Sequence, residues 1–192
     1  MPNRIAIATE GPSDEEVLEE ICSKAGHQAW AASAEGKDAL FRDFDKILRG
    51  LEAKVAPSHF LVVTDLQPEQ DCPSEADRWR QAIRRRFPRA KLCLCIWELE
   101  AWLLADPSAV HTVLGVDHVH HHNPDKIGDT KPSKILEDMF HKKLGCSRGT
   151  AYDKKSDGKA LAQNLDLRAA SQASPSLEHF LQTIKMKQER LL

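Results

Sequence analysis

Short apolar runs alternate with amphipathic segments through the N-terminal half of the chain. Four runs have the length and continuity of strands, most of them buried on both faces, namely residues 5–9, 29–34, 60–65 and 91–97. Three segments between them repeat apolar residues at helical spacing, namely residues 14–25, 37–54 and 75–87. This alternation predicts an α/β fold in which helices flank a mostly parallel central sheet.

The pattern changes in the C-terminal part of the chain. A helix is predicted at 99–105, and polar segments at 117–129 and 150–158 predict loops. Further helices are predicted to begin near Pro132, Lys159 and Pro175. We expect residues 1–114 to form the α/β core and residues 115–192 a helical extension packed on it, in a single compact domain.

Two of the predicted strands end on a carboxylate. Glu10 follows the first strand, and Asp65 ends the run at 60–65. Chemistry in open α/β sheets collects at the carboxyl ends of the strands, and carboxylate oxygens suit Mg²⁺. Either residue alone would better fit a structural role in a turn, but the pair predicts a divalent-metal site. After Glu10, a Gly-Pro turn leads to Ser13 and Glu16, whose spacing predicts a capping box.

A third acidic segment follows the strand at 91–97. Glu98 and Glu100 stand two residues apart between Trp97 and Trp102. Residues two apart on a helix point in different directions, so one glutamate is expected to face the metal site and the other to cap a helix. At least one of the tryptophans is expected in the core. Asp71, in the loop after the strand that ends at Asp65, is another candidate ligand.

Composition is that of an ordinary folded domain. Of 192 residues, 41% are hydrophobic and 29% charged. No apolar run is long enough to span a membrane and the N-terminus reads as a strand, so we expect no membrane segment, no export signal and a cytoplasmic protein. The five cysteines form no CxxC pair, which excludes a zinc ribbon and argues against a disulfide framework. The net charge of −2 does not imply tight non-specific duplex binding.

Basic residues gather in the second part of the chain. Arg84 and Arg85 belong to a dense arginine run that would suit phosphate or a solvated helix face. Among five lysines near the C-terminal loops (Lys131, Lys134, Lys154, Lys155 and Lys159), Lys159 stands at a predicted helix start, where backbone N–H groups favour an anion. We expect Lys159, with Lys131, to contact phosphate, the alternative being plain helix surface.

Other familiar sites are missing from the sequence. His118 and His120–His122 form a cluster without the spaced partners of a zinc motif, so a solvated loop is expected there. No P-loop, GxGxxG, GxSxG or HExxH motif occurs. The nucleotide-binding folds, serine hydrolases and zinc peptidases that carry these motifs are therefore not indicated.

Together these segments resemble the Toprim-type metal-binding domain and, more closely, the small bacterial family called domain of unknown function 4276. The resemblance rests on three blocks and one looser stretch that cover most of the chain, namely Thr-Glu-Gly-Pro-Ser-Asp-Glu at 9–15, Val-Thr-Asp at 63–65, Leu-Glu-Ala-Trp-Leu-Leu at 99–104, and residues 131–133, 152–154 and 157–162.

The resemblance implies a four-stranded, mainly parallel sheet and a Mg²⁺ (or Mn²⁺) site. Glu10 matches the glutamate of the first strand and Asp65 the first aspartate of an Asp-x-Asp pair. Gln67 stands where the second aspartate would be, so Glu100 is expected to supply the missing ligand. Glu10 would be a ligand or general base, and Lys159 would hold phosphate.

The implied function is a metal-dependent phosphodiester hydrolase, a nuclease acting on DNA or RNA, in antiphage defence with an ATPase partner. Two alternatives stay open: a non-catalytic partner or regulatory subunit of an ATPase with a degraded metal site, and a metal-dependent enzyme on a small phosphorylated substrate. Topoisomerase chemistry is not expected, because the single tyrosine, Tyr152, lies in a predicted loop. The oligomeric state is left open.

Overall fold

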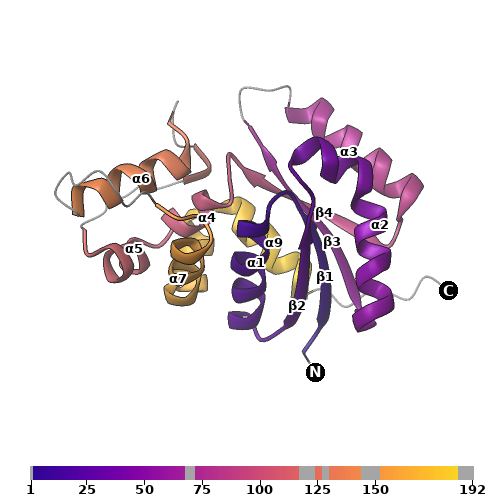
Figure 1. Ribbon diagram of the computed structural model, residues 1–192, viewed down its shortest axis with the longest axis horizontal. Coiled ribbons are helices and arrows are strands. Elements are labelled where there is room, and N and C mark those ends of the chain that lie inside the picture. The colour runs from indigo at the N-terminus through magenta and orange to yellow at the C-terminus, as the bar shows by residue number, and fades with distance from the viewer. Residues whose placement is uncertain (1, 68–71, 117–123, 127–129, 144–151, 186–192) are drawn as a thin grey trace.

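The computed structural model describes residues 2–67, 72–116, 124–126, 130–143 and 152–185. Four strands form one sheet in the order β2-β1-β3-β4 (Figure 1), and all three pairings are parallel. Their bounds are β1 (Arg4–Thr9), β2 (Gln28–Ser33), β3 (His59–Leu66) and β4 (Ala90–Ile96). The predicted α/β class and parallel sheet are confirmed, and each predicted strand lies within one or two residues of an observed one.

Helices connect the strands and make up the C-terminal part of the described chain. Their bounds are α1 (Pro12–Lys24), α2 (Lys37–Val55), α3 (Cys72–Arg86), α4 (Glu100–Leu104), α5 (Pro107–Leu114), α6 (Pro132–Lys143), α7 (Ser156–Asn164), α8 (Leu167–Ala173) and α9 (Pro175–Lys185), with a 3₁₀ turn at Pro124–Lys126. None of the helices within these described ranges combines the length and apolar character needed to cross a membrane.

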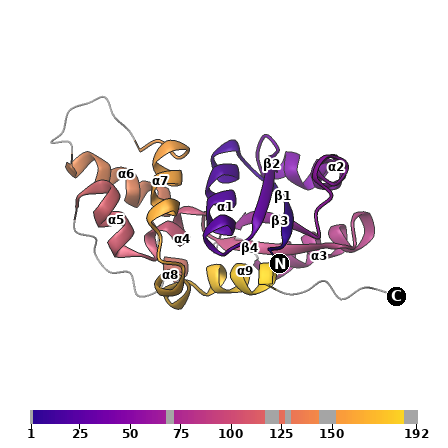
Figure 2. The same cartoon turned by 90° about the horizontal axis from the view of Figure 1, so that it is seen from below.

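The sheet is covered on both faces because side chains alternate along each strand. Ile5 and Ile7 of β1 point to the side of α1 and α9, where the larger core cluster lies. Ala6 and Ala8 point to the other side, toward α2 and α3. Figure 2 shows the sheet between these two helix pairs. The carboxyl ends of the strands are therefore left open at one edge of the sheet, as in other doubly covered parallel sheets.

The helices α4 to α8 extend the larger core cluster away from the sheet (Figure 1), so the expected helical extension is confirmed. α4 and α5, which precede residue 115, pack on α6, α7 and α8. The apolar pattern does not reveal α5 and α8. Asp106 starts α5 by accepting the N–H of Ser108, and Asp166 starts α8 by accepting those of Arg168 and Ala169. Both helices are short and begin at aspartate caps.

A buried polar network joins α4 to α9. The indole N–H of the fully buried Trp102 donates to Ser176 Oγ over 2.7 Å. Asp125 accepts the Ser174 hydroxyl and the Ser176 N–H, each over 2.8 Å. Because Asp125 is also buried, these bonds replace the water that its carboxylate has lost. The expectation that a tryptophan serves the core is met by Trp102.

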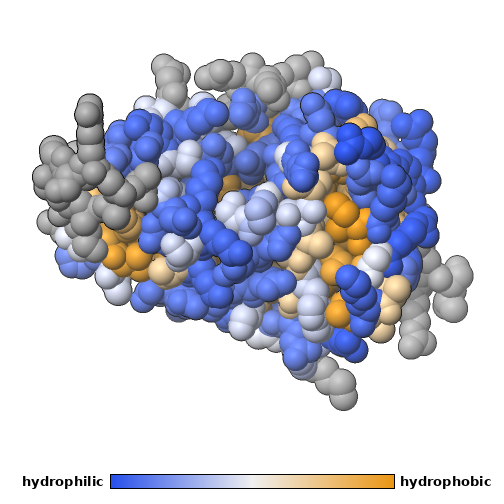
Figure 3. Space-filling model, in the orientation of Figure 1, coloured by the Kyte–Doolittle hydropathy of each residue, from blue (hydrophilic) through white to orange (hydrophobic). Residues whose placement is uncertain are grey.

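The outer edge of β2 is bonded to side chains of α1. Glu19 Oε1 accepts the N–H of Ala31 over 2.8 Å, and Glu15 Oε1 accepts the N–H of Ser33 over 2.7 Å. The glutamates stand four residues apart on one helix face, and the two amides stand two residues apart on one strand edge. Figure 3 shows a largely hydrophilic face on which apolar residues reach the surface in two places, beside α2 and over α5.

Candidate functional site

Glu10 bridges the ends of β1 and β3. Its Oε1 accepts the Thr64 hydroxyl over 2.5 Å and the backbone N–H of Asp65 over 2.9 Å. The two bonds fix this glutamate across the sheet edge, so the strand-end carboxylates Glu10 and Asp65 are brought together as the sequence predicts. A narrow cleft between them is lined by Thr9, Glu10, Asp14, Val63, Thr64, Asp65, Cys95 and Leu99.

Asp14 is a site residue that the sequence reasoning missed. The expected capping box of Ser13 and Glu16 is wrong, because Gly11 caps the helix and Pro12 occupies its first turn. Asp14 instead accepts the Gly11 N–H over 3.0 Å and the Thr9 hydroxyl over 3.3 Å. This places its carboxylate in the cleft. Asp14 could have been predicted from its position four residues after Glu10, in the first turn of the helix that follows the strand.

Asp65 has no counter-ion among the residues that the structure describes. No hydrogen bond or ion pair of its side chain is found in the described part of the chain. Burial raises its pKa well above the ordinary range, and the charges of Glu10, Asp14 and Glu100 raise it further. An acidic group held in this way has its charged form stabilised by a cation.

The two glutamates after β4 have different partners. Trp97 turns the chain there with a φ of 71°, an uncommon backbone conformation for a bulky residue that costs on the order of 1–3 kcal/mol. Glu98 Oε2 then accepts the N–H of Ser133 over 3.0 Å, which caps α6. Glu100 is 6% exposed, and its charge raises the pKa of both Asp14 and Asp65. Glu100 therefore lies near the two aspartates, although it is not among the residues that line the cleft.

Lys154, and not Lys159, is the lysine that reaches these carboxylates. Its Nζ lies 2.9 Å from Glu100 Oε1. Asp153 sets this position by accepting the N–H groups of Lys155 and Ser156. Although desolvation lowers the pKa of Lys154, the charge and hydrogen bond of Glu100 outweigh it and the pKa lies above its ordinary value. Asp153 caps α7 by accepting the Ser156 N–H, and it is the residue from which the start of this helix could have been predicted.

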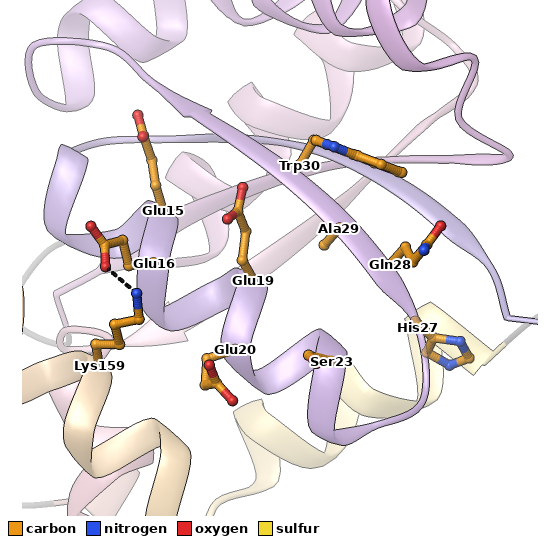
Figure 4. A pocket seen from close by; sticks show the side chains of 10 residues that line it. All are labelled: Glu15, Glu16, Glu19, Glu20, Ser23, His27, Gln28, Ala29, Trp30 and Lys159. Carbon is orange, nitrogen blue, oxygen red and sulfur yellow. Dashed lines mark ion pairs between the residues drawn. The ribbon is translucent and has the colours of Figure 1, made fainter.

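Lys159 lies elsewhere. Helix α7 begins at Ser156, three residues before the predicted start, so Lys159 is not at a helix terminus and the anion argument for its position is wrong. Its ammonium pairs with Glu16 of α1 over 2.9 Å, beside the glutamate row of that helix (Figure 4). Gly158 is a packing residue and not a start signal: a Cβ there would lie 3.2 Å from Val17 Cγ2. The structure does not bring Lys159 to the cleft.

The other basic candidates divide between the two ends of the sheet. Arg84 and Arg85 are exposed near the end of α3, which leads back to the start of β4, so they lie at the edge opposite the carboxylates. Lys131 is exposed and precedes α6, whose Ser133 N–H binds Glu98. Lys131 is thus on the same side as the cleft. Phosphate contact by these residues stays a prediction.

The donor chemistry of the cleft fits Mg²⁺. Three carboxylates with hard oxygen donors line it (Glu10, Asp14 and Asp65), and Glu100 lies near enough for its charge to raise the pKa of Asp14. Within the described ranges, no three acidic, histidine or cysteine residues stand close enough to hold a metal by themselves. Mg²⁺ commonly binds through one or two carboxylates and keeps several waters, so it does not require such a group. Asp71 and the histidine cluster lie outside the described residues.

Asp14 predicts a pH dependence of stability in metal-free protein. Burial first, then the charges of Glu100 and Glu10, raise its pKa from 3.8 to about 6, although the Gly11 N–H and Lys154 oppose the shift. A raised carboxyl pKa means that the folded state holds the proton longer, so its contribution to stability is lost as pH rises through about 4 to 6.

We therefore expect Asp14→Asn, which retains the oxygen acceptor, to gain stability relative to wild type as pH rises. The gain between about pH 4.5 and pH 7 is expected to be about 1–2 kcal/mol, allowing for solvent screening. Urea unfolding in chelator at both pH values measures it. A difference that stays constant with pH would contradict the assignment.

Comparison with known proteins places the chain beside one family. The sequence model of the family described as "Domain of unknown function (DUF4276)" matches residues 9–185, nearly the whole chain, including Glu10, Asp14, Asp65 and Glu100. No curated protein and no solved structure gives a significant match.

Proposed function

The chain belongs to the DUF4276 family, and we propose that it is a Mg²⁺-dependent, Toprim-like phosphodiester hydrolase, a nuclease that works in antiphage defence beside an ATPase partner. The family description names no activity, so the proposal rests on the cleft. Its candidate ligands are Glu10, Asp65 and Glu100, as expected from the sequence, and Asp14; one or two of them would hold the ion together with water.

One observation carries the proposal. Asp65 is a partly buried carboxylate with no cationic partner in the described part of the chain, and the charges of Glu10, Asp14 and Glu100 raise its pKa. A carboxylate that is repelled by its neighbours lowers the stability of the folded protein. A divalent cation removes that cost, and the carboxyl ends of parallel strands are where such sites are built.

The residues of the cleft have separable tasks in this proposal. Thr64 and the Asp65 N–H hold one oxygen of Glu10, which orients the other oxygen toward a ligand. Lys154 pairs directly with the ligand Glu100 and, with Lys131, would contact the phosphodiester. When bound, the metal would activate water and stabilise the leaving oxygen.

The test is cleavage of single- and double-stranded DNA and RNA with Mg²⁺ or Mn²⁺. Glu10→Ala is expected to reduce cleavage at least about 10²-fold, because the variant loses a ligand and the bridge between β1 and β3. Glu16→Ala, which removes a carboxylate of the same helix region that pairs with Lys155 and Lys159 outside the cleft, should cleave like wild type. Equal activity in all three proteins would refute the site.

A second candidate is the non-catalytic partner subunit of an ATPase. It is favoured by Gln67 at the expected aspartate position and by the lack of a three-residue metal group among the described residues. Calorimetry with Mn²⁺ and with Mg²⁺ decides between the two, since a degraded site binds neither ion. Metal binding without nucleic-acid cleavage would direct the search to small phosphorylated substrates, whose binding depends less steeply on salt.

A further inference from the structure

Glu100 has one ionic partner in the described part of the chain. It is 6% exposed, and its Oε1 lies 2.9 Å from the ammonium of Lys154. A buried carboxylate that loses its counter-ion carries a large desolvation cost. In the metal-free protein, Lys154 therefore stabilises the charge of Glu100.

The side chain of Lys154 can move away from Glu100 without a change in the backbone at the start of α7. Its side chain is 45% exposed. The backbone around it is fixed separately, because Asp153 Oδ1 accepts two N–H groups of the helix start and Asp157 Oδ2 accepts the Asp153 N–H over 2.8 Å. A lysine on a flexible four-carbon stem can thus change partners without unfolding α7.

We propose that Lys154 is the counter-ion of the metal-free cleft, which a divalent cation displaces from Glu100 so that the ammonium becomes available to the substrate phosphate. Lys154 then competes with the metal for the same carboxylate oxygen. The inference rests on the proposed function, since it requires that Glu100 belong to a metal site. It adds a role for a lysine that would contact the substrate rather than the metal.

The first test is the affinity for Mn²⁺ measured by calorimetry. Lys154→Met is expected to bind Mn²⁺ more tightly than wild type, on the order of tenfold, because a nearby positive charge that repels the cation is gone. The matched control is Lys155→Met, which loses an exposed pair with Glu16 and should bind like wild type. A residue that merely supported the fold would give weaker binding when removed.

The second test needs no variant. Acetylation of wild-type lysines with limiting acetic anhydride, with and without Mn²⁺, is read by peptide mass spectrometry. Labelling of Lys154 is expected to rise severalfold on Mn²⁺ binding while that of Lys155 stays constant. The rise reports release from Glu100 and does not depend on cleavage.

The outcomes separate the two proposals. If wild type binds Mn²⁺ but Lys154→Met binds it equally or less tightly, or if Lys154 labelling does not rise, the counter-ion role is overturned and the metal site stands. If wild type binds no divalent cation, the proposed function falls and the counter-ion role with it.

Discussion

Asp65→Asn is expected to abolish metal-dependent cleavage and to make the metal-free protein more stable. The amide keeps the shape of the side chain but removes the charge that Glu10, Asp14 and Glu100 repel. We expect cleavage to fall roughly 10³-fold or more, since a metal ligand is lost. The melting temperature in chelator at neutral pH should rise by about 3–6 °C, for a gain of about 1–2 kcal/mol.

Single-turnover cleavage and thermal melting measure the two effects on the same samples. The wild-type melting temperature should rise with Mn²⁺ and that of the variant should not. Asp45→Asn is the contrasting control, because Asp45 is an acid with a partner, Arg86, and its loss should lower stability. If Asp65→Asn melts below wild type in chelator, or if it still cleaves nucleic acid, then Asp65 is not a metal ligand.

Trp102→Ala is expected to destabilise the fold more than any change to a carboxylate of the cleft. The ring is fully buried and packs against Phe180 of α9 with 5.1 Å between ring centroids. Removing it leaves a cavity where α4 meets α9, at a cost of about 3–5 kcal/mol. The indole bond to Ser176 is lost as well.

Trp102→Phe separates packing from hydrogen bonding. It keeps an aromatic ring but not the donor to Ser176. We expect it to lower the free energy of unfolding by about 1–2 kcal/mol. Urea unfolding followed by circular dichroism gives both values. A cost below about 2 kcal/mol for Trp102→Ala would mean that α9 does not rely on this residue.

Most of the sheet could be read from the sequence because buried parallel strands are continuous apolar runs. The run at 60–65 is an example, with the strand extending one residue further at each end. The helices α5 and α8 could not be read in the same way. They are only 8 and 7 residues long, which is too short to show a clear helical repeat of apolar residues. The sequence marks each of them mainly by the aspartate that caps its start, Asp106 or Asp166.

The site is predictable where it depends on strand ends and unpredictable where it depends on helix starts. Glu10 and Asp65 follow from the strands alone. Asp14 lies in the first turn of α1 and Lys154 just before α7, and the sequence pattern does not define where these two helices begin. Because α7 begins at Ser156, Lys154 stands before the helix and pairs with Glu100, whereas Lys159 stands within it and pairs with Glu16.

The bonds from Glu15 and Glu19 to β2 decide how another protein can attach. An exposed strand edge is a template for β-augmentation, domain swapping and amyloid-like growth. Here the outward amides of Ala31 and Ser33 already have carboxylate acceptors, so an arriving strand would have to displace both. Strand addition at this edge would therefore cost both of these carboxylate bonds from α1.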